Sequence, residues 1–493
     1  MFKKITAFLL ILLLAASPVA VLADTPFQGY TYNFWGTLVP SPAAYVPIRS
    51  FGLHNICPEL GDMADPTDLH VDAENNIYVV DWGNDRIVIF DMDLNLIRVI
   101  DGYYRYGEWV ENGLRRPHGI FVTDDMEIFI ADEHNNRVVV LNVIDGDVHF
   151  VREILAPDIE GLEDDFVFSP LHVLVDRGGR VFVIVRHVFE GIMSFSDEGE
   201  FLGYFGTIEV SFNWIDMAWR FLMTEAQIEF DNAILPREFQ SMDIDQYGFI
   251  FTTHIENWHL NNQVMRLNPR GEDVLVNFND NVVINGDQGY RPTGPMSGPS
   301  VLIDVIARSH GKYSALDSTR GRVYTYDSEG NLLYVFGGMG SLEGMTRMPR
   351  AIEMIGDDML LLDSLGRGRI IHYAPTEYGR LINRAIAMRY GGHERYAVEY
   401  WRQLVTLDEN FALAWSGIGR SLLAAGDNVG AMEYLRQGMD VRYFSIAFRR
   451  NRLDVMQGTL PNVFTAGMLL VVLFVGGKIY YRVKFGKREE EEA

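Results

Sequence analysis

The sequence predicts an all-β six-bladed β-propeller, followed by a small helical region and one membrane-spanning helix. Three observations support this prediction: a unit of short strands that recurs six times, a change to a helical period near Tyr378, and an apolar run near the C-terminus. Internal repeats determine the architecture of such a chain. They also account for a length of 493 residues, well above the roughly 100–200 residues of one domain.

The chain divides into five predicted segments, each with its own composition. These are a signal peptide at 1–23, the propeller at 24–376, helical repeats at 377–458, a transmembrane helix at 460–482 and a charged tail at 483–493.

The repeated unit is best seen in its first copy, PTDLHVDAENNIYVVDWGNDRIVIFDMDLNLIRVIDG, which begins at Pro66. The other copies begin at Pro117, Pro170, about Pro236, about Val301 and Pro349. Each contains β-branched and aromatic runs separated by polar turns such as SDEGE and DSEGN, which is typical of four antiparallel strands per unit. Before the fourth copy, the insert WIDMAWRFLMTEAQIEF is expected to form a loop or helix over one propeller face.

An aspartate and an arginine recur at a fixed interval within the unit. An Asp that closes the second strand can accept backbone N–H bonds from the turn, and an Arg that opens the third can donate to a carboxylate. The interval is five residues in three copies and six in the last, in the pairs Asp81 and Arg86, Asp132 and Arg137, Asp317 and Arg322, and Asp363 and Arg369.

The motifs around these pairs, DWGNDRI, DEHNNRV, DSTRGRV and the longer DSLGRGRI, resemble those of the NHL family of β-propellers. The resemblance covers roughly residues 46–373 and implies the propeller fold. The third and fourth copies depart from the pattern, with Val185 and His254 at or near the Asp position.

Ring closure requires one strand from outside the six copies. The last copy turns helical where its fourth strand should lie, whereas Tyr45–Gly52, YVPIRSFG, resembles the fourth strands GYFG and LLYVFG. An open ring would leave unpaired edge strands. We therefore expect the N-terminal segment to complete blade six.

A 34-residue repeat follows the propeller, relating Gly392 to Gly426 and AVEYWRQ to AMEYLRQ. The stretch ALAWSGIGRSLLAAGDNVGAMEYLRQGMD resembles the TPR consensus. Two copies fall below the roughly three that an independent solenoid needs, so they are expected to pack on the propeller or a partner. The aromatic residues Tyr400, Trp401 and Tyr434 are candidates for contacting a protein partner.

The two ends of the chain indicate export and anchoring. MFKK and the apolar ITAFLLILLLAASPVAVLA form a signal peptide with expected cleavage after Ala23, although an uncleaved anchor is the alternative. Val463–Tyr481 carries one charge and is long enough to cross a bilayer, the alternative being a buried core helix. Basic residues after the span favour a cytoplasmic tail, namely Arg482, Lys484, Lys487 and Arg488. Other basic residues precede the span, namely Arg449, Arg450 and Arg452.

Composition excludes some functions. The formal net charge of −25 offers no basic footprint for nucleic acid, and the single cysteine, Cys57, permits no intrachain disulfide. The sequence contains no nucleophile elbow, phosphate loop or zinc-spaced cluster, so we assign no catalytic residue and expect no cofactor except a divalent cation.

That cation would lie in the central channel. Aligned copies place six carboxylates and imidazoles on innermost strands, where they could hold calcium or another divalent ion: Asp68, His70, His172, Asp243, Asp304 and Glu353. The alternative is an ordinary polar, water-lined channel. His118 and His254 are expected to be structural.

The modules together predict a cell-membrane protein with one span, its propeller and helices extracytoplasmic. We expect a binding or scaffold protein for a protein or glycan. The resemblance to bacterial surface proteins with NHL and TPR repeats implies an accessory role beside a transporter or other multi-pass membrane protein. The alternative is a hydrolase or lyase of gluconolactonase-like type with a metal in the channel.

Overall fold

A computed structural model describes residues 25–158, 166–206, 238–255, 263–275, 286–287 and 299–489. The predicted signal peptide and the insert at 214–230 lie outside these residues. The chain forms two compact units, the first comprising Met1–Tyr32 and Gly36–Asn383, the second Asn33–Trp35 and Arg384–Ala493.

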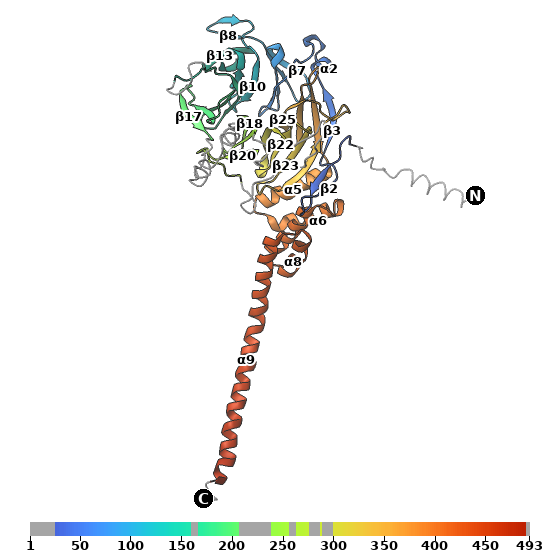
Figure 1. The fold of residues 1–493 in the computed structure, drawn as a ribbon, viewed down its shortest axis with the longest axis vertical. Helices are drawn as coiled ribbons and strands as arrows, with labels where there is room; N and C mark the ends of the chain where they lie inside the picture. Colours follow the sequence, from blue (N-terminus) through green and yellow to red (C-terminus); the bar gives the residue numbers. More distant parts are fainter. Residues whose placement is uncertain are drawn as a thin grey trace, which may run out of the picture. The chain divides into compact units, whose positions relative to one another are not determined.

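The first unit is the predicted six-bladed propeller, which is therefore confirmed (Figure 1). Each blade is an antiparallel sheet whose first strand is innermost. Blade one contains β4 (Asp68–Val71), β5 (Ile77–Asp81), β6 (Arg86–Phe90) and β7 (Leu96–Ile100), and blade two contains β10 (Pro117–Val122), β11 (Ile128–Asp132), β12 (Arg137–Ile144) and β13 (Asp147–Ile154). Blade three contains β14 (Pro170–Val175), β15 (Val181–Val185), β16 (Ile192–Phe195) and β17 (Phe201–Phe205).

The remaining blades follow the same order. The described part of blade four contains β18 (Glu238–Ile244), β19 (Ile250–Ile255) and β20 (Val264–Leu267). Blade five contains β21 (Leu302–Ala307), β22 (Tyr313–Asp317), β23 (Arg322–Tyr326) and β24 (Leu332–Gly337). Blade six contains β25 (Pro349–Ile355), β26 (Asp358–Asp363), β27 (Arg369–Pro375) and β3 (Tyr45–Phe51).

The ring closes through contacts between successive innermost strands. β4 contacts β10, and the series continues through β14, β18, β21 and β25 back to β4. The fourth strand of blade six is β3, which pairs antiparallel with β27. This is the segment predicted to complete that blade.

The hydrophobic core lies between the blades. One buried cluster joins blades six and one through residues such as Leu69 and Leu362, and another joins blades two and three through Val140 and Val183. Two additions extend the unit: the pair β1 (Tyr30–Tyr32) and β2 (Leu38–Pro40), and the hairpin β8 (Tyr103–Arg105) and β9 (Glu108–Val110) beside β13. A short helix, α2, covers Leu53–Ile56.

The recurring Asp and Arg form a hydrogen bond with each other in three copies. Arg86 donates to Asp81 over 2.8 Å, and Arg137 and Arg369 bond to Asp132 and Asp363 in the same way. In the fifth copy Arg322 donates to a different carboxylate, that of Asp287, over 2.7 Å, in agreement with the expectation that an Arg at this position donates to a carboxylate.

The second unit is helical. Helix α5 (Glu377–Tyr390) crosses the boundary between the units, and α6 (Glu394–Leu407), α7 (Ala412–Ala425), α8 (Asn428–Gln437) and α9 (Val441–Glu489) follow. Consecutive helices from α6 to α9 pack against one another. Gly426 ends α7 in a left-handed conformation, φ +90°, which favours glycine. Packing of this kind does not by itself identify TPR repeats, so that assignment stays a prediction.

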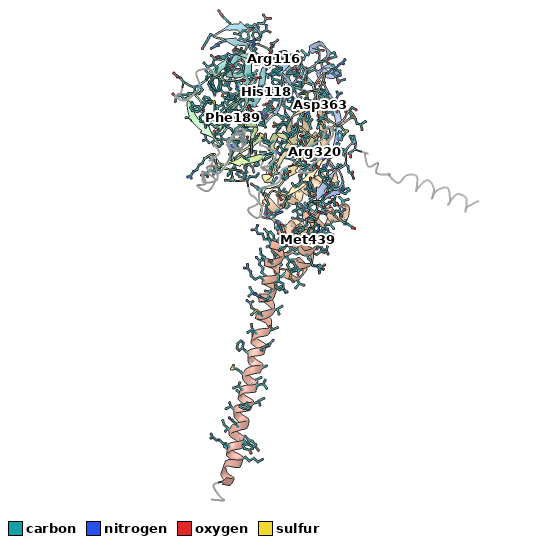
Figure 2. The ribbon with its side chains drawn as sticks, in the orientation of Figure 1. Arg116, His118, Phe189, Arg320, Asp363 and Met439 are labelled. Carbon is teal, nitrogen blue, oxygen red and sulfur yellow. The ribbon has the colours of Figure 1, made fainter. Side chains whose placement is uncertain are left out.

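Helix α9 has two parts with different surroundings. Near its start Ala447 is buried, and Asp454 accepts a hydrogen bond from Asn428 over 2.7 Å. Beyond Val455 the apolar side chains are exposed and extend from the helix with no other described segment against them (Figure 2). By length and composition α9 is the one helix among the described residues that could cross a membrane, within Val441–Lys484.

Candidate functional site

The innermost strands place equivalent residues of the blades around the central channel at two levels. Strand register puts Asp68 opposite Val80, His172 opposite Ile184 and Asp304 opposite Leu316, one residue before the end of each second strand. The corresponding set, which we call the upper ring, is Asp68, Gly119, His172, Ser241, Asp304 and Ala351. Because side chains alternate along a strand, residues two positions on form a lower ring of His70, Phe121, Leu174, Asp243, Ile306 and Glu353.

The six residues predicted for the channel therefore divide between the rings. Asp68, His172 and Asp304 lie in the upper ring, whereas His70, Asp243 and Glu353 lie in the lower one. Between strands, His172 Nε2 lies 3.8 Å from Asp68 Oδ2, and His70 Nδ1 lies 3.7 Å from Glu353 Oε2.

Three channel aspartates bind the backbone of the next blade. Asp68 accepts the N–H of Ile120 over 2.9 Å, and Asp304 accepts that of Ile352 over 2.7 Å. Asp243 accepts the N–H of Ala307, also over 2.7 Å. These carboxylates thus join successive innermost strands and satisfy buried donors that would otherwise be costly.

Burial shifts the titration of these groups. It raises the pKa of Asp68 to about 7 and that of Asp304 to about 6, and it lowers the pKa of His70 to about 4. Within the described ranges, no three His, Cys, Asp or Glu side chains come together in an arrangement that could hold a metal ion. The divalent cation therefore stays a prediction without geometric support.

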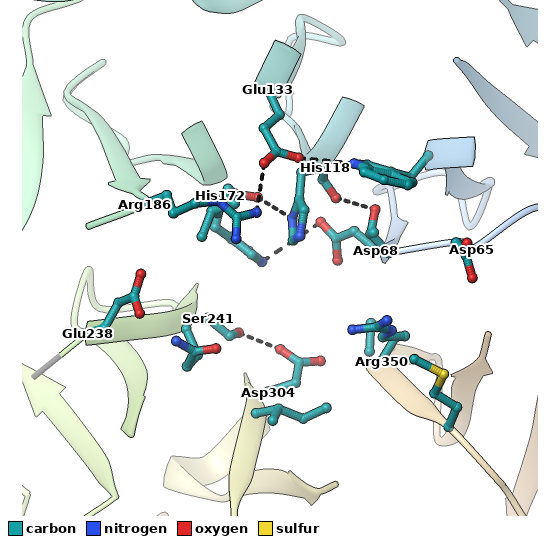
Figure 3. A pocket seen from close by; sticks show the side chains of 17 residues that line it. Asp65, Asp68, His118, Glu133, His172, Arg186, Glu238, Ser241, Asp304 and Arg350 are labelled. Carbon is teal, nitrogen blue, oxygen red and sulfur yellow. Dashed lines mark hydrogen bonds and ion pairs between the residues drawn. The ribbon is translucent and has the colours of Figure 1, made fainter. Parts of the chain in front are cut away.

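A cavity of about 580 Å³ opens at the upper-ring end of the channel (Figure 3). Its lining combines upper-ring residues with residues just before the innermost strands or just after the second strands. The lining side chains are Asp65, Thr67, Asp68, Trp82, His118, Glu133, Leu171, His172, Arg186, Glu238, Gln240, Ser241, Ile303, Asp304, Met348, Arg350 and Ala351.

Three of these residues follow the second strands of successive blades and bond to one another. Glu133 is buried and accepts hydrogen bonds from the indole of Trp82, over 3.0 Å, and from Arg186, over 2.7 Å. Burial alone would raise the pKa of Glu133, but these two donors hold it below its usual range. Glu133 therefore holds the side chains of Trp82 and Arg186 in place on one side of the cavity.

His118, predicted to be structural, also lines the cavity. Its Nδ1 lies 2.9 Å from the carbonyl oxygen of Leu171, which can only accept, so Nδ1 donates and carries hydrogen. Burial lowers the pKa of His118 to about 4. The neutral ring is thus anchored to blade three and leaves Nε2 without a proton. His254, also predicted to be structural, is fully buried on β19.

Sequence reasoning missed Trp82, Glu133 and Arg186. The available signal was their position, because each directly follows the strand end marked by Asp81, Asp132 or Val185. Residues at this position in a propeller lie at the channel mouth, so comparing them across copies would have found the set.

The aromatic residues predicted to contact a partner lie in the helical unit. Trp401 is fully buried, and its ring lies so close to Gly417 that a Cβ there would meet it at 2.5 Å. Its ring is therefore accessible only if the helices separate. Tyr400 and Tyr434 are half-buried, and Tyr434 stacks on Trp415 with 6.1 Å between ring centroids.

Comparisons with known proteins show similarity to solved propellers at low identity. The Staphylococcus aureus virginiamycin B lyase has a TM-score of 0.40 and 10% identity, covering 66% of this chain and 99% of that chain. A putative gluconolactonase gives 0.38 and 12%, with 68% and 96% covered, and the PQQ-bound aldose sugar dehydrogenase of Streptomyces coelicolor gives 0.37 and 12%, with 68% and 99%. No family model and no curated protein matches the chain. At such identities these likenesses concern the fold alone.

Proposed function

We propose that the protein is a membrane-anchored binding protein that displays its propeller outside the cytoplasm and uses its helices to contact a neighbouring membrane protein. The observation that carries the proposal is the continuity of α9, which packs beside α8 at its start and continues as an exposed apolar helix. A single helix of this kind holds the helical bundle close to a bilayer surface.

The chemistry of the channel supports binding rather than metal-dependent turnover. Asp68, Asp243 and Asp304 are engaged by backbone N–H groups of neighbouring blades, so they hold the ring together. A glycan or a protein remains the proposed ligand class for the propeller as a whole, and a multi-pass transporter is the proposed membrane partner.

Topology can be tested by labelling single cysteines. In a Cys57→Ser background, Glu108→Cys would place a thiol at the exposed β8–β9 turn, and Lys487→Cys would place one after the span. A membrane-impermeant maleimide added to intact cells should label the first variant, and the second only after permeabilisation. The reverse pattern would refute the proposed orientation.

Partner contact can be tested by site-specific crosslinking. A photoreactive residue in place of Tyr400 should give a crosslinked membrane protein in intact membranes, whereas the same residue at Glu108 serves as the control. A second comparison uses a chemical crosslinker on the unmodified chain and on a chain lacking residues 378–440, and only the unmodified chain should give the adduct. Identical adducts in all these samples would remove the support for docking through the helices.

The second candidate function is a hydrolase or lyase, favoured by the neutral His118 in the cavity. An imidazole with a free Nε2 is suited to act as a general base. Turnover that disappears in His118→Gln while Tyr400-dependent crosslinking persists would favour this alternative.

A further inference from the structure

Arg350 and Glu238 carry opposite charges, line the cavity and do not pair with each other, and the exposed Asp65 also lines it. Arg350 belongs to β25 in blade six, and Glu238 belongs to β18 in blade four, so blade five separates them. In Figure 3 their charged groups lie on opposite sides of the cavity. Each of these two side chains makes one hydrogen bond to a neighbouring residue, and the two side chains do not contact each other.

Arg350 is positioned as an anion receptor. Its Nε donates to the hydroxyl of Ser364 over 3.2 Å, and Ser364 is buried and donates in turn to the carbonyl of Met348. This contact orients the guanidinium but leaves its terminal amino groups free, and no described carboxylate forms an ion pair with it. Two parallel N–H donors in that fork match the two oxygens of a carboxylate.

Glu238 is the complementary group. One of its carboxylate oxygens accepts the backbone N–H of His187 over 3.2 Å, which fixes the side chain at the rim of the cavity. Among the described residues no cation pairs with it, so its second oxygen can accept from an ammonium group.

We propose that this cavity binds a short peptide, with the C-terminal carboxylate on Arg350 and the N-terminal ammonium at Glu238. The proposal rests on the proposed function in treating the propeller as a binding module. A ligand with one charge would satisfy only one of the two groups. A single amino acid carries both charged groups on the same Cα, whereas the groups to be bridged lie two blades apart, so the two ends of a short peptide fit better.

The surfaces between the charged groups suit a peptide chain. Gln240 offers an amide group for main-chain hydrogen bonds, the Ser241 hydroxyl donates to Asp304 and can only accept one, and Leu171, Ile303 and Met348 offer apolar surface. The volume of about 580 Å³ lies within the range of roughly 300–1,000 Å³ that is usual for small-ligand sites. Polar groups that fix orientation within a partly apolar wall are typical of such sites.

The ligand side of the test needs no variant. Isothermal titration calorimetry on the full-length protein in detergent would compare triglycine with N-acetyltriglycine and triglycinamide. We expect triglycine to bind and each blocked peptide to bind at least about tenfold more weakly, because each lacks one charge-assisted contact. Equal affinities for the three peptides, or no binding of triglycine, would overturn the proposal.

Variants assign each end of the peptide to its residue. In Arg350→Met, triglycine and triglycinamide should bind equally, and in Glu238→Gln, triglycine and N-acetyltriglycine should bind equally. The exposed residues Arg347 and Glu198 supply the controls Arg347→Met and Glu198→Gln, which should retain the full discrimination.

Two further results distinguish the peptide site from a simple anion site and from the proposed docking function. Glucuronate that binds as tightly as triglycine and depends on Arg350 would show an anion site and refute the peptide assignment. Loss of the Tyr400-dependent crosslink with unchanged triglycine binding would refute the proposed docking function but leave the peptide site standing.

Discussion

The carboxylate of Asp68 in blade one accepts the backbone N–H of Ile120 in blade two over 2.9 Å. Asp304 makes the same connection from blade five to Ile352 in blade six. Both carboxylates are also bound by the N–H of the following residue in their own strand, Leu69 and Val305. The innermost strands of neighbouring blades belong to separate sheets. Side-chain hydrogen bonds such as these therefore join them.

Replacing Asp68 or Asp304 with alanine should destabilise the propeller. Each change leaves two buried N–H donors without their acceptor, and an unsatisfied buried donor costs about 1–3 kcal/mol. Thermal melts of the detergent-solubilised protein should show a lower midpoint for both variants. Asp125→Ala, at an exposed turn, is the control and should leave the midpoint unchanged. Equal melting of Asp68→Ala and Asp125→Ala would mean that the blades do not need this connection.

The same carboxylate should make stability depend on pH. Burial raises the pKa of Asp68 from 3.8 to about 7, so the folded state binds a proton that the unfolded state releases. This group therefore stabilises the fold fully below about pH 4, and its contribution is lost as the pH rises through about 7. Burial lowers the pKa of the neighbouring His172, so its contribution to stability changes with pH in the opposite direction. His172 is present in both proteins compared below.

Asp68→Asn isolates the carboxyl contribution because the amide does not titrate. The melting temperature of this variant should lie below that of the unmodified protein, and the difference between the two should be larger at pH 5 than at pH 8. Melting curves of the pair at both pH values provide the measurement. A difference between the two proteins that does not change with pH would show that Asp68 ionises normally.

The fold was predictable where a local pattern repeats. The interval from Asp81 to Arg86 places both residues in one turn, where Arg86 donates to a carboxylate as expected, and the structure shows that this carboxylate is Asp81. At Arg322 the acceptor is another carboxylate, because Asp287 and Tyr30 come from distant parts of the chain and lie against the guanidinium. Spacing within a repeat carries no information about such residues.

The site was predictable only in part for a related reason. Alignment of the copies placed Asp68, His172 and Asp304 on innermost strands, but the bonds of the two aspartates to the next blade depend on the stagger between neighbouring strands. The role of Glu133 depends on Trp82 and Arg186 in two other blades. Only the three-dimensional arrangement brings such groups together.

Tyr45 should be essential for closing the ring. It is fully buried on β3, donates its hydroxyl hydrogen to the carbonyl of Asp357 over 3.0 Å and accepts from Arg308 over 2.8 Å. Tyr45→Ala should cost about 3–5 kcal/mol, as for other large buried aromatic residues, and Tyr45→Phe about 1–3 kcal/mol. Denaturant titration followed by fluorescence would measure both.

The control lies on the same strand. Ile48 is 53% exposed, so Ile48→Ala should change stability little. Removing Tyr45–Gly52 altogether should be far more damaging than removing the EEEE tail at residues 489–492. If the two truncations unfold at the same denaturant concentration, blade six does not depend on β3.

The helical unit offers a matched pair of glycines. Gly417 in α7 faces the ring of Trp401, and a Cβ there would lie 2.5 Å from it, too close for a side chain. Alanine normally stabilises a helix interior relative to glycine by about 1 kcal/mol, but here the overlap must be relieved by moving the buried indole of Trp401. Forcing extra volume into a packed core costs about 1–3 kcal/mol, so the overlap should outweigh the gain in helix propensity.

Gly417→Ala should therefore destabilise the contact between α6 and α7, whereas Gly458→Ala, at a position in α9 with open space around it, should be neutral or stabilising. Hydrogen exchange of the α6 and α7 amides in the full-length protein would report the difference directly, since local opening exposes them. Faster exchange should appear only in Gly417→Ala. If both variants exchange alike, the close packing of Trp401 on α7 does not hold these helices together, and the indole would then be accessible to a partner as first predicted.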